Sequence, residues 1–364
     1  MNQTLKSLPF ASLMAVLAVS ISAYSTLGEA APARYEPPRN SFGQPDIQGV
    51  WDFRTLTPLE RPKELGNKAV FTEEEERAFR NKAVETLDVD RLREDASTDA
   101  ATDIEGAYNN FWFDYGTAMD EDRRTSLIVD PANGRLPDLT PAALAQLKNA
   151  HNRAYPVRDI LSIGLTNFLP EGPETTGLSE RCLVSFNAGP PLNPSAYNNN
   201  IRIVQTPEHV VLFTEMIHDA RIVHMADGPQ LPAELTKWTG ASHGRWEGNT
   251  LVVETTNLTD KTPTYQMPID LNDPSRNGVV GVGKNMKLTE KFTPVSKSVL
   301  LYEYTIDDPA TFTKPFTVAI SMRATEDQIF EYACHEGNHG LAGMLKGARQ
   351  TEKEARAAVK PTKN

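Results

Sequence analysis

The sequence predicts a mainly β protein, an antiparallel meander that closes into a barrel or sandwich, with a helical insertion near the N-terminus and a C-terminal helix. Two observations carry this prediction. From residue 181 onward, short apolar segments of strand length follow one another and are separated by turn residues. The stretches at about 71–96 and 341–364 are instead rich in helix-forming residues. Closure leaves few exposed strand edges, which favours a barrel or sandwich over an open sheet.

The N-terminal half contains fewer strand signals. A strand is predicted over 46–53, and a helix begins after Thr72, because Thr72 can cap it and Glu75 occupies the capping-box position. A further strand is predicted over 123–130, and a short helix runs from Pro141 to Arg153. We therefore expect one β-rich domain over residues 46–340, with the helical insertion at about 71–155 and a helical or frayed tail at 341–364.

The strands of the second half are predicted from alternating apolar residues between turn signals such as Glu247-Gly248-Asn249. The expected strands cover residues 181–186, 201–206, 209–217, 221–225, 244–246, 250–256, 286–292, 298–306, 316–323 and 328–334.

The first 30 residues are typical of a secretory signal peptide. Lys6 precedes an apolar run at about 8–23, and small residues follow it. The run is shorter than the roughly 20 residues that span a bilayer, so we expect cleavage and no membrane insertion afterwards; a retained anchor is the alternative. A Pro-rich lead occupies residues 31–45. The predicted location is periplasmic or secreted.

The formal net charge of -11 argues against a nucleic-acid partner, because no basic stripe is present to neutralise phosphates. The two cysteines, Cys182 and Cys334, are far apart in the sequence. In an oxidising compartment they can form one long-range disulfide. The alternative is two buried thiols that act as small apolar residues.

Glu215, His218, Asp219 and Arg221 form the first polar cluster, at the junction of two predicted strands. A histidine can exchange a proton near neutral pH, a carboxylate can orient it, and an arginine can hold an anion. Along an extended chain His218 and Asp219 point to opposite faces, so they pair directly only across a turn. The alternative is a solvated hairpin turn.

The second cluster lies in residues 329–340, which contain His335, Glu336 and His339 in an H-E-x-x-H spacing. A zinc peptidase needs both histidines on one face of a helix, whereas Gly337 and Asn338 are poor helix formers. We expect this stretch to be the last strand, with Glu331 and His335 on one face and Cys334 and Glu336 on the other. The disulfide would then bring Arg181 and His335 to the same mouth as His218.

Several predicted strands carry one carboxylate within an apolar run, and arginines recur in the same way. If these side chains face inward, they form a charged ring around a small ligand. The alternative is an ordinary polar outer face. The residues concerned are Glu215, Glu254, Glu290, Glu303, Glu331, Arg202, Arg221 and Arg323.

Two resemblances extend this interpretation. Gly49-Val50-Trp51 resembles the G-x-W that opens the first strand of lipocalin-type barrels. The segments RTSLIVDP (124–131), EMIHDARI (215–222), GRWEGNTLVVET (244–255) and EYACHEGN (331–338) resemble a large family of exported, mostly uncharacterised proteins of environmental proteobacteria and acidobacteria. In that family a tyrosine often stands where this chain has His339, which weakens the H-E-x-x-H interpretation. The resemblance implies export but no particular activity.

We predict an exported enzyme that performs acid-base chemistry, hydrolysis or elimination, on a small organic molecule at a polar barrel mouth. His218 and His335 would transfer protons, and Asp219 and Glu336 would orient them. Arg181 and Arg221 would hold a substrate oxygen, together with Glu215 and Glu331. No cofactor is expected. The alternatives are a non-catalytic periplasmic protein that binds a small ligand, and a zinc-dependent hydrolase.

Overall fold

The computed structural model describes residues 35–88, 113–150, 169–225, 231–267 and 278–358. The predicted signal peptide and parts of the predicted helical insertion, residues 89–112 and 151–155, lie outside these residues. So does the end of the predicted tail, residues 359–364.

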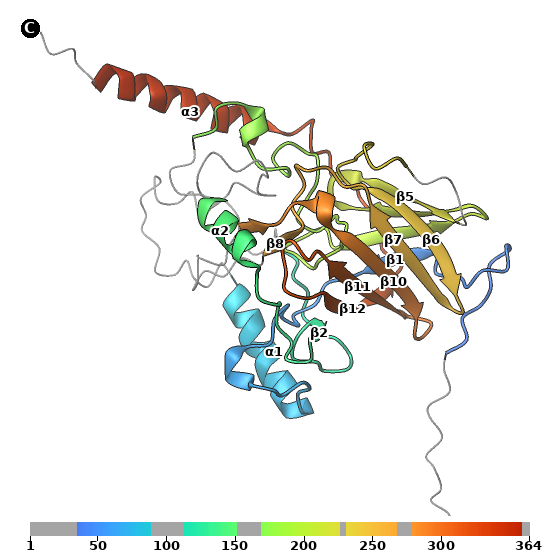
Figure 1. Cartoon of the computed structure of the whole chain (residues 1–364). Helices are drawn as coiled ribbons and strands as arrows, with labels where there is room; N and C mark the ends of the chain where they lie inside the picture. Colours follow the sequence, from blue (N-terminus) through green and yellow to red (C-terminus); the bar gives the residue numbers. More distant parts are fainter. Residues whose placement is uncertain (1–34, 89–112, 151–168, 226–230, 268–277, 359–364) are drawn as a thin grey trace, which may run out of the picture. The chain divides into compact units, whose positions relative to one another are not determined.

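The core of the protein is a closed β-barrel, which confirms the predicted fold class (Figure 1). The first barrel strand pairs with both its neighbour and the last strand, so the sheet closes on itself. In sheet order the barrel strands are β1 (Gly49–Asp52), β3 (Asn200–Gln205), β4 (His209–Thr214), β5 (Ala220–Met225), β6 (Ala241–Glu247), β7 (Thr250–Thr256), β10 (Lys287–Pro294), β11 (Val299–Asp307) and β12 (Phe316–Thr325).

The barrel departs from the predicted antiparallel meander at one pair of strands. β5 and β6 are parallel, with Val223 opposite Ser242 and Met225 opposite Gly244. Two parallel neighbours require the chain to return to the end of the barrel at which it started. Chain connectivity requires this return between Met225 and Ala241, and sequence alternation carries no signal for it.

The seam of the barrel is only partly closed by strand pairing. β1 meets β12 over three residues, Val50 to Asp52, and the short β2 (Ile128–Asp130) pairs further along β12. Polar groups complete the seam: Asp120 accepts a hydrogen bond from the Ser321 backbone N–H at 2.6 Å. Arg124 donates to the Ala319 carbonyl at 2.9 Å. The segment before β2 therefore covers the β12 edge, which would otherwise expose unpaired backbone groups.

Within the described residues, three α-helices lie outside the barrel: α1 (Glu73–Leu87), α2 (Pro141–Ala150) and α3 (His339–Ala358) (Figure 1). The predicted capping box of α1 is present, since Thr72 accepts from the Glu75 N–H and Glu75 accepts from the Thr72 N–H. A separate two-stranded sheet pairs β8 (Tyr265–Met267) with β9 (Gly278–Val280). Among the described residues, no helix is both long enough and apolar enough to cross a membrane.

Two predicted strands are wrong. Residues 181–186 form turns, and Cys182 has a left-handed backbone (φ 56°) that a strand does not tolerate. Residues 328–334 are irregular, so the expected alternation of Glu331, His335, Cys334 and Glu336 between two faces does not exist. Phe330 is 69% exposed, so an apolar run of strand-like composition can lie at the surface without a sheet partner.

One end of the barrel carries the β4–β5 turn (215–219), and we call it the His218 mouth. Residues 188–193, the plug segment, enter the barrel from this end. Leu192 is fully buried, and its N–H donates to the Tyr302 hydroxyl at 3.0 Å. The Tyr304 hydroxyl donates to Asn193 at 2.6 Å. Aromatic and aliphatic side chains fill the rest of the described interior, so the barrel is a packed core closed at this mouth by the plug.

Candidate active site

The turn at the His218 mouth is strained. β4 ends at Thr214, a short 3-10 turn follows, and β5 begins at Ala220. Ile217 and His218 both have left-handed backbones, with φ of 51° and 43°. A β-branched residue is a genuine outlier in that region, and each such residue costs about 1–3 kcal/mol. Strain of this size persists where the surrounding structure fixes the conformation, and such sites are enriched in functional residues.

The His218 ring is held by the C-terminal segment. Its Nδ1 lies 2.9 Å from the Tyr332 carbonyl oxygen. A carbonyl oxygen has no proton to donate, so Nδ1 must carry the hydrogen. In the neutral ring the lone pair is then on Nε2, and the side chain is exposed. Fixing the tautomer through Nδ1 is the arrangement that prepares a histidine to act as a base through Nε2.

A disulfide fastens the same segment to the mouth. Cys182 and Cys334 are bonded, which confirms the predicted long-range pairing. Asn338 strengthens the junction, because its side chain donates to the Glu180 carbonyl at 2.6 Å and accepts from the Leu341 N–H as the cap of α3. A disulfide of this kind persists in an oxidising compartment.

Glu215 is a brace beneath the turn. It is only 4% exposed, and its two carboxylate oxygens accept from the Asn200 side chain at 2.8 Å and from the Phe330 N–H at 3.2 Å. The carboxylate therefore ties β3 and the C-terminal segment to the turn. Its predicted role in substrate binding remains a prediction.

Asp219 and Arg221 lie at the edge of the plug. Both line a narrow void under the plug segment that is too tight to admit a water molecule. Asp219 is close enough to Arg221 to help raise the pKa of the guanidinium. In an extended chain, the side chains of His218 and Asp219 would point to opposite faces. Here the two residues lie in a turn, so that restriction does not apply to them.

Arg221 reaches inward to Glu290 rather than outward. Its guanidinium makes a bidentate pair with the Glu290 carboxylate at 2.5 and 2.8 Å, and Glu290 also accepts from the Tyr302 hydroxyl at 2.8 Å. Glu290 is fully buried and Arg221 is 8% exposed. Burial alone would lower the pKa of Arg221, but the charge and hydrogen bonds of Glu290 outweigh it and the pKa is raised.

The predicted ring of interior charges is therefore reduced to one ion pair. The buried members are Arg221, Glu290 and the brace Glu215. Glu254 and Glu303 alternate with buried neighbours and face the outer surface, and Glu331 is exposed. Placing several unpaired carboxylates inside a packed barrel would cost several kcal/mol each, so the interior keeps only charges that have partners.

His335 and Glu336 are exposed on the turn after the disulfide. α3 begins at His339, so His335 and His339 do not share a helical face as a zinc peptidase motif requires. Among the described residues, no group of three histidine, cysteine or acidic side chains converges on one point. Arg181 lies over the Trp238 ring at 5.9 Å, a cation–π contact beside the disulfide.

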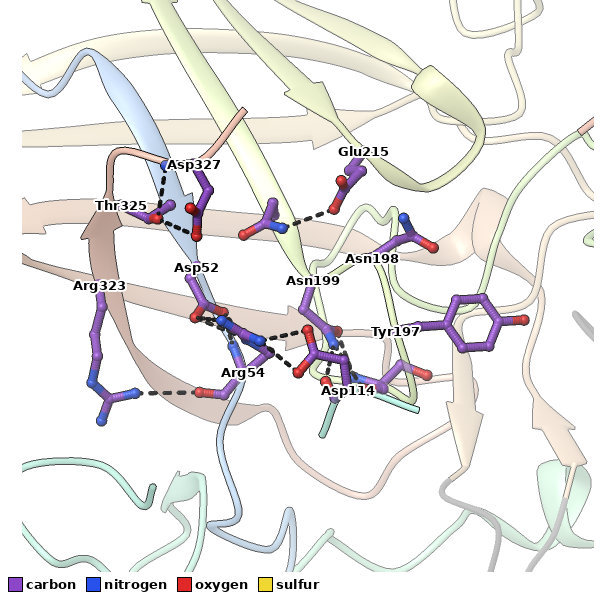
Figure 2. A network of polar contacts seen from close by, with 12 residues as sticks. Asp52, Arg54, Asp114, Tyr197, Asn198, Asn199, Glu215, Arg323, Thr325 and Asp327 are labelled. Carbon is purple, nitrogen blue, oxygen red and sulfur yellow. Dashed lines mark hydrogen bonds and ion pairs between the residues drawn. The ribbon is translucent and has the colours of Figure 1, made fainter. Parts of the chain in front are cut away.

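A second polar network braces the barrel rim near the turn (Figure 2). Arg54 bonds both oxygens of Asp52 at 2.7–2.9 Å and also Asp114 at 2.5 Å. The hydrogen bond to Asp52 is the main reason that the pKa of Arg54 is raised. Asn199 links the network to the plug region by donating to the Asp114 carbonyl at 3.2 Å. Arg54 is bonded to both carboxylates, which suits a structural role.

Sequence reasoning missed the plug and the Tyr302 hydroxyl. Gly189-Pro190-Pro191 was a visible signal for a rigid turn, but nothing local indicates that this turn enters a barrel. It also missed a groove of about 600 Å³ at the opposite end of the barrel. Tyr35, Trp51, Arg202, Lys297 and Asp327 are among the residues that line it.

No protein-family model, curated protein or solved structure matches this chain.

Proposed function

We propose that the protein is an exported enzyme that performs acid-base chemistry on a small organic molecule at the His218 mouth. The fixed tautomer of His218 is the observation that supports this most. A strained turn holds the residue, Tyr332 binds Nδ1, and Nε2 is exposed to an approaching molecule. His218 would take a proton through Nε2, and hydrolysis or elimination are the reactions that this single step serves.

The charges around the turn favour an anionic or carbonyl-bearing substrate. Arg181 lies beside the disulfide, and Arg221 is held at the plug edge next to Asp219. Arg181 would hold a substrate oxygen directly. Arg221 is fully occupied by Glu290, so it would act through its field on Asp219. His335 and Glu336 would assist from the exposed turn. Family membership, suggested by the four motifs, and a periplasmic or secreted location belong to the same proposal.

The test replaces His218 by asparagine. The Nδ2 of asparagine can donate to the Tyr332 carbonyl in place of Nδ1, and asparagine tolerates a left-handed backbone. His218→Asn therefore keeps the turn and removes only the base. Wild-type protein is screened against nitrophenyl esters, lactones and substrates of β-elimination. For any substrate that is turned over, kcat/KM should fall by about 10²–10⁴ in His218→Asn, with an unchanged Tm.

His335→Asn is the matched control, because His335 is also exposed but no hydrogen bond from the described residues fixes its ring. We expect a smaller loss of kcat/KM in this variant than in His218→Asn. Full turnover by a folded His218→Asn protein would refute the proposal. So would a wild-type protein that binds ligands of the screen but converts none of them.

That last outcome would favour the second candidate function, a non-catalytic protein that binds a small ligand. The 600 Å³ groove supports this candidate, because it combines an aromatic edge at Trp51 with Arg202 and Asp327. It lies at the other end of the barrel. Ligand-induced changes in Trp51 fluorescence that persist in His218→Asn would point to it.

A further inference from the structure

Three histidines form a row on the outer surface of the barrel, away from the His218 mouth. His209 on β4 is directly opposite His224 on β5, and His224 is directly opposite His243 on β6. β5 and β6 are side by side in Figure 1. We call His209, His224 and His243 the histidine row. The side chains alternate with the buried Val210 and Val223, so the three rings project to the outside.

The first pair of the row is as close as two strand residues can be. The Met225 N–H donates to the Glu208 carbonyl at 2.8 Å, which makes Glu208 and Met225 a hydrogen-bonded pair. Pairs alternate along an antiparallel ladder, so His209 and His224 form a non-hydrogen-bonded pair, in which side chains approach most closely. Their ring centres are 5.0 Å apart, and those of His224 and His243 are 5.9 Å apart.

These separations match a shared metal ion. If two imidazole nitrogens each lie about 2.0–2.1 Å from one ion at an angle of about 90–110°, the ring centres are about 4.5–5.3 Å apart. The 5.0 Å pair falls within this range, and the 5.9 Å pair lies just outside it. A small rotation of the His243 ring would bring it closer.

The lone pairs needed for coordination are available. None of the three rings has a hydrogen-bond partner among the described residues. Three adjacent imidazoles whose ring nitrogens have no partner among the described residues are placed to share an ion as ligands.

We propose that the histidine row binds one divalent transition-metal ion, held mainly by His209 and His224. Imidazole ligands favour Cu²⁺, Ni²⁺ and Zn²⁺, and Cu²⁺ binds tightest in the order of affinities. Water completes the coordination, since the three side chains do not converge on a single point. The site is separate from the His218 mouth and does not depend on the proposed enzymatic function.

The test uses the disulfide-intact protein without a histidine tag. CuCl₂ and ZnCl₂ are titrated into it by calorimetry, and the Cu²⁺ form is examined by electron paramagnetic resonance. Wild type should bind one ion per chain, with nitrogen couplings from two imidazoles. His224→Gln should weaken binding at least tenfold, because His224 belongs to both pairs. His209→Gln should weaken it by a similar factor and leave coupling to fewer nitrogens.

His335→Gln is the control, because it removes an exposed histidine that is not in the row. It should leave affinity and stoichiometry unchanged. The proposal fails if wild type shows no saturable binding, if His224→Gln and His209→Gln bind as well as wild type, or if His335→Gln loses as much affinity as they do. Circular dichroism of each variant excludes unfolding as the cause of a loss.

Discussion

The ion pair between Arg221 and Glu290 shows how single residues organise the mouth. The two charges are buried together. The Tyr302 hydroxyl donates a hydrogen bond to Glu290 and accepts one from the Leu192 N–H of the plug segment. Removing such charges from water costs several kcal/mol per ion before pairing, so the geometry of the pair must be good. The same residues hold the plug in place, which links interior electrostatics to the closure of the barrel.

Replacing one partner of this pair should be much worse than replacing both. Glu290→Leu leaves a buried, unpaired guanidinium and should destabilise the protein by about 3–5 kcal/mol. The double variant Arg221→Met, Glu290→Leu removes both charges and should recover most of that loss. The free energy of unfolding in urea measures each. A loss in the double variant equal to the sum of the losses in Glu290→Leu and Arg221→Met alone would show that the two residues are not coupled.

At the level of elements, α1 packs on the rest of the protein only with partly buried side chains and is capped at its N-terminus. None of its residues is buried, and its N-terminus carries four consecutive glutamates with a capping box. The Lys68 ammonium, followed by the Thr72 backbone N–H, lowers the pKa of Glu75 from 4.5 to about 2. A lowered carboxyl pKa means that the contribution of Glu75 is complete above about pH 4.5 and is lost as the pH falls toward 2.

Acidification should therefore open α1 before it opens the barrel. Amide hydrogen exchange of Glu76 to Leu87, corrected for the intrinsic pH dependence of exchange, should show protection that declines between about pH 4.5 and 2. Glu75→Gln should remove that decline. Thr72→Ala also weakens the cap but keeps the carboxyl group, so it should retain a decline. An identical pH profile for wild type and Glu75→Gln would contradict this account.

The elements also show where sequence patterns succeed and fail. β3, β7 and β11 were predicted within one residue of their observed bounds, because alternation reports one buried face directly. The strand predicted at 209–217 ran beyond β4 into the turn, and the one predicted at 244–246 covers only part of β6. The strand predicted at 328–334 failed. It has no partner strand among the described residues and Phe330 is 69% exposed, while its backbone bonds go to the Glu215 side chain and the His218 ring.

At the scale of the whole molecule, the disulfide joins the C-terminal segment to the His218 mouth across 152 residues of sequence. Without it, that segment would be held by the hydrogen bonds to His218, Glu215 and Glu180, which are few and partly exposed. The bond therefore controls whether Tyr332 can fix the His218 ring.

Cys182→Ser with Cys334→Ser should lower the free energy of unfolding by about 2–5 kcal/mol, because a long loop is no longer closed in the unfolded chain. Hydrogen exchange at residues 330–338 should rise more than exchange in β10–β12. Wild-type protein under a reducing agent should behave in the same way. Unchanged protection at 330–338 in the reduced protein would mean that the disulfide does not hold this segment.

The sequence by itself determined the β-rich class, the capping box of α1, most barrel strands and the two cysteines that pair. Each depends on residues close in sequence or on composition, which local pattern reports. Only the tertiary structure decided which end of the barrel the plug closes, that Arg221 faces Glu290, that the Tyr332 carbonyl fixes His218, and that three histidines line up across β4, β5 and β6. These are contacts between residues distant in sequence, and strand register sets them after local structure has formed.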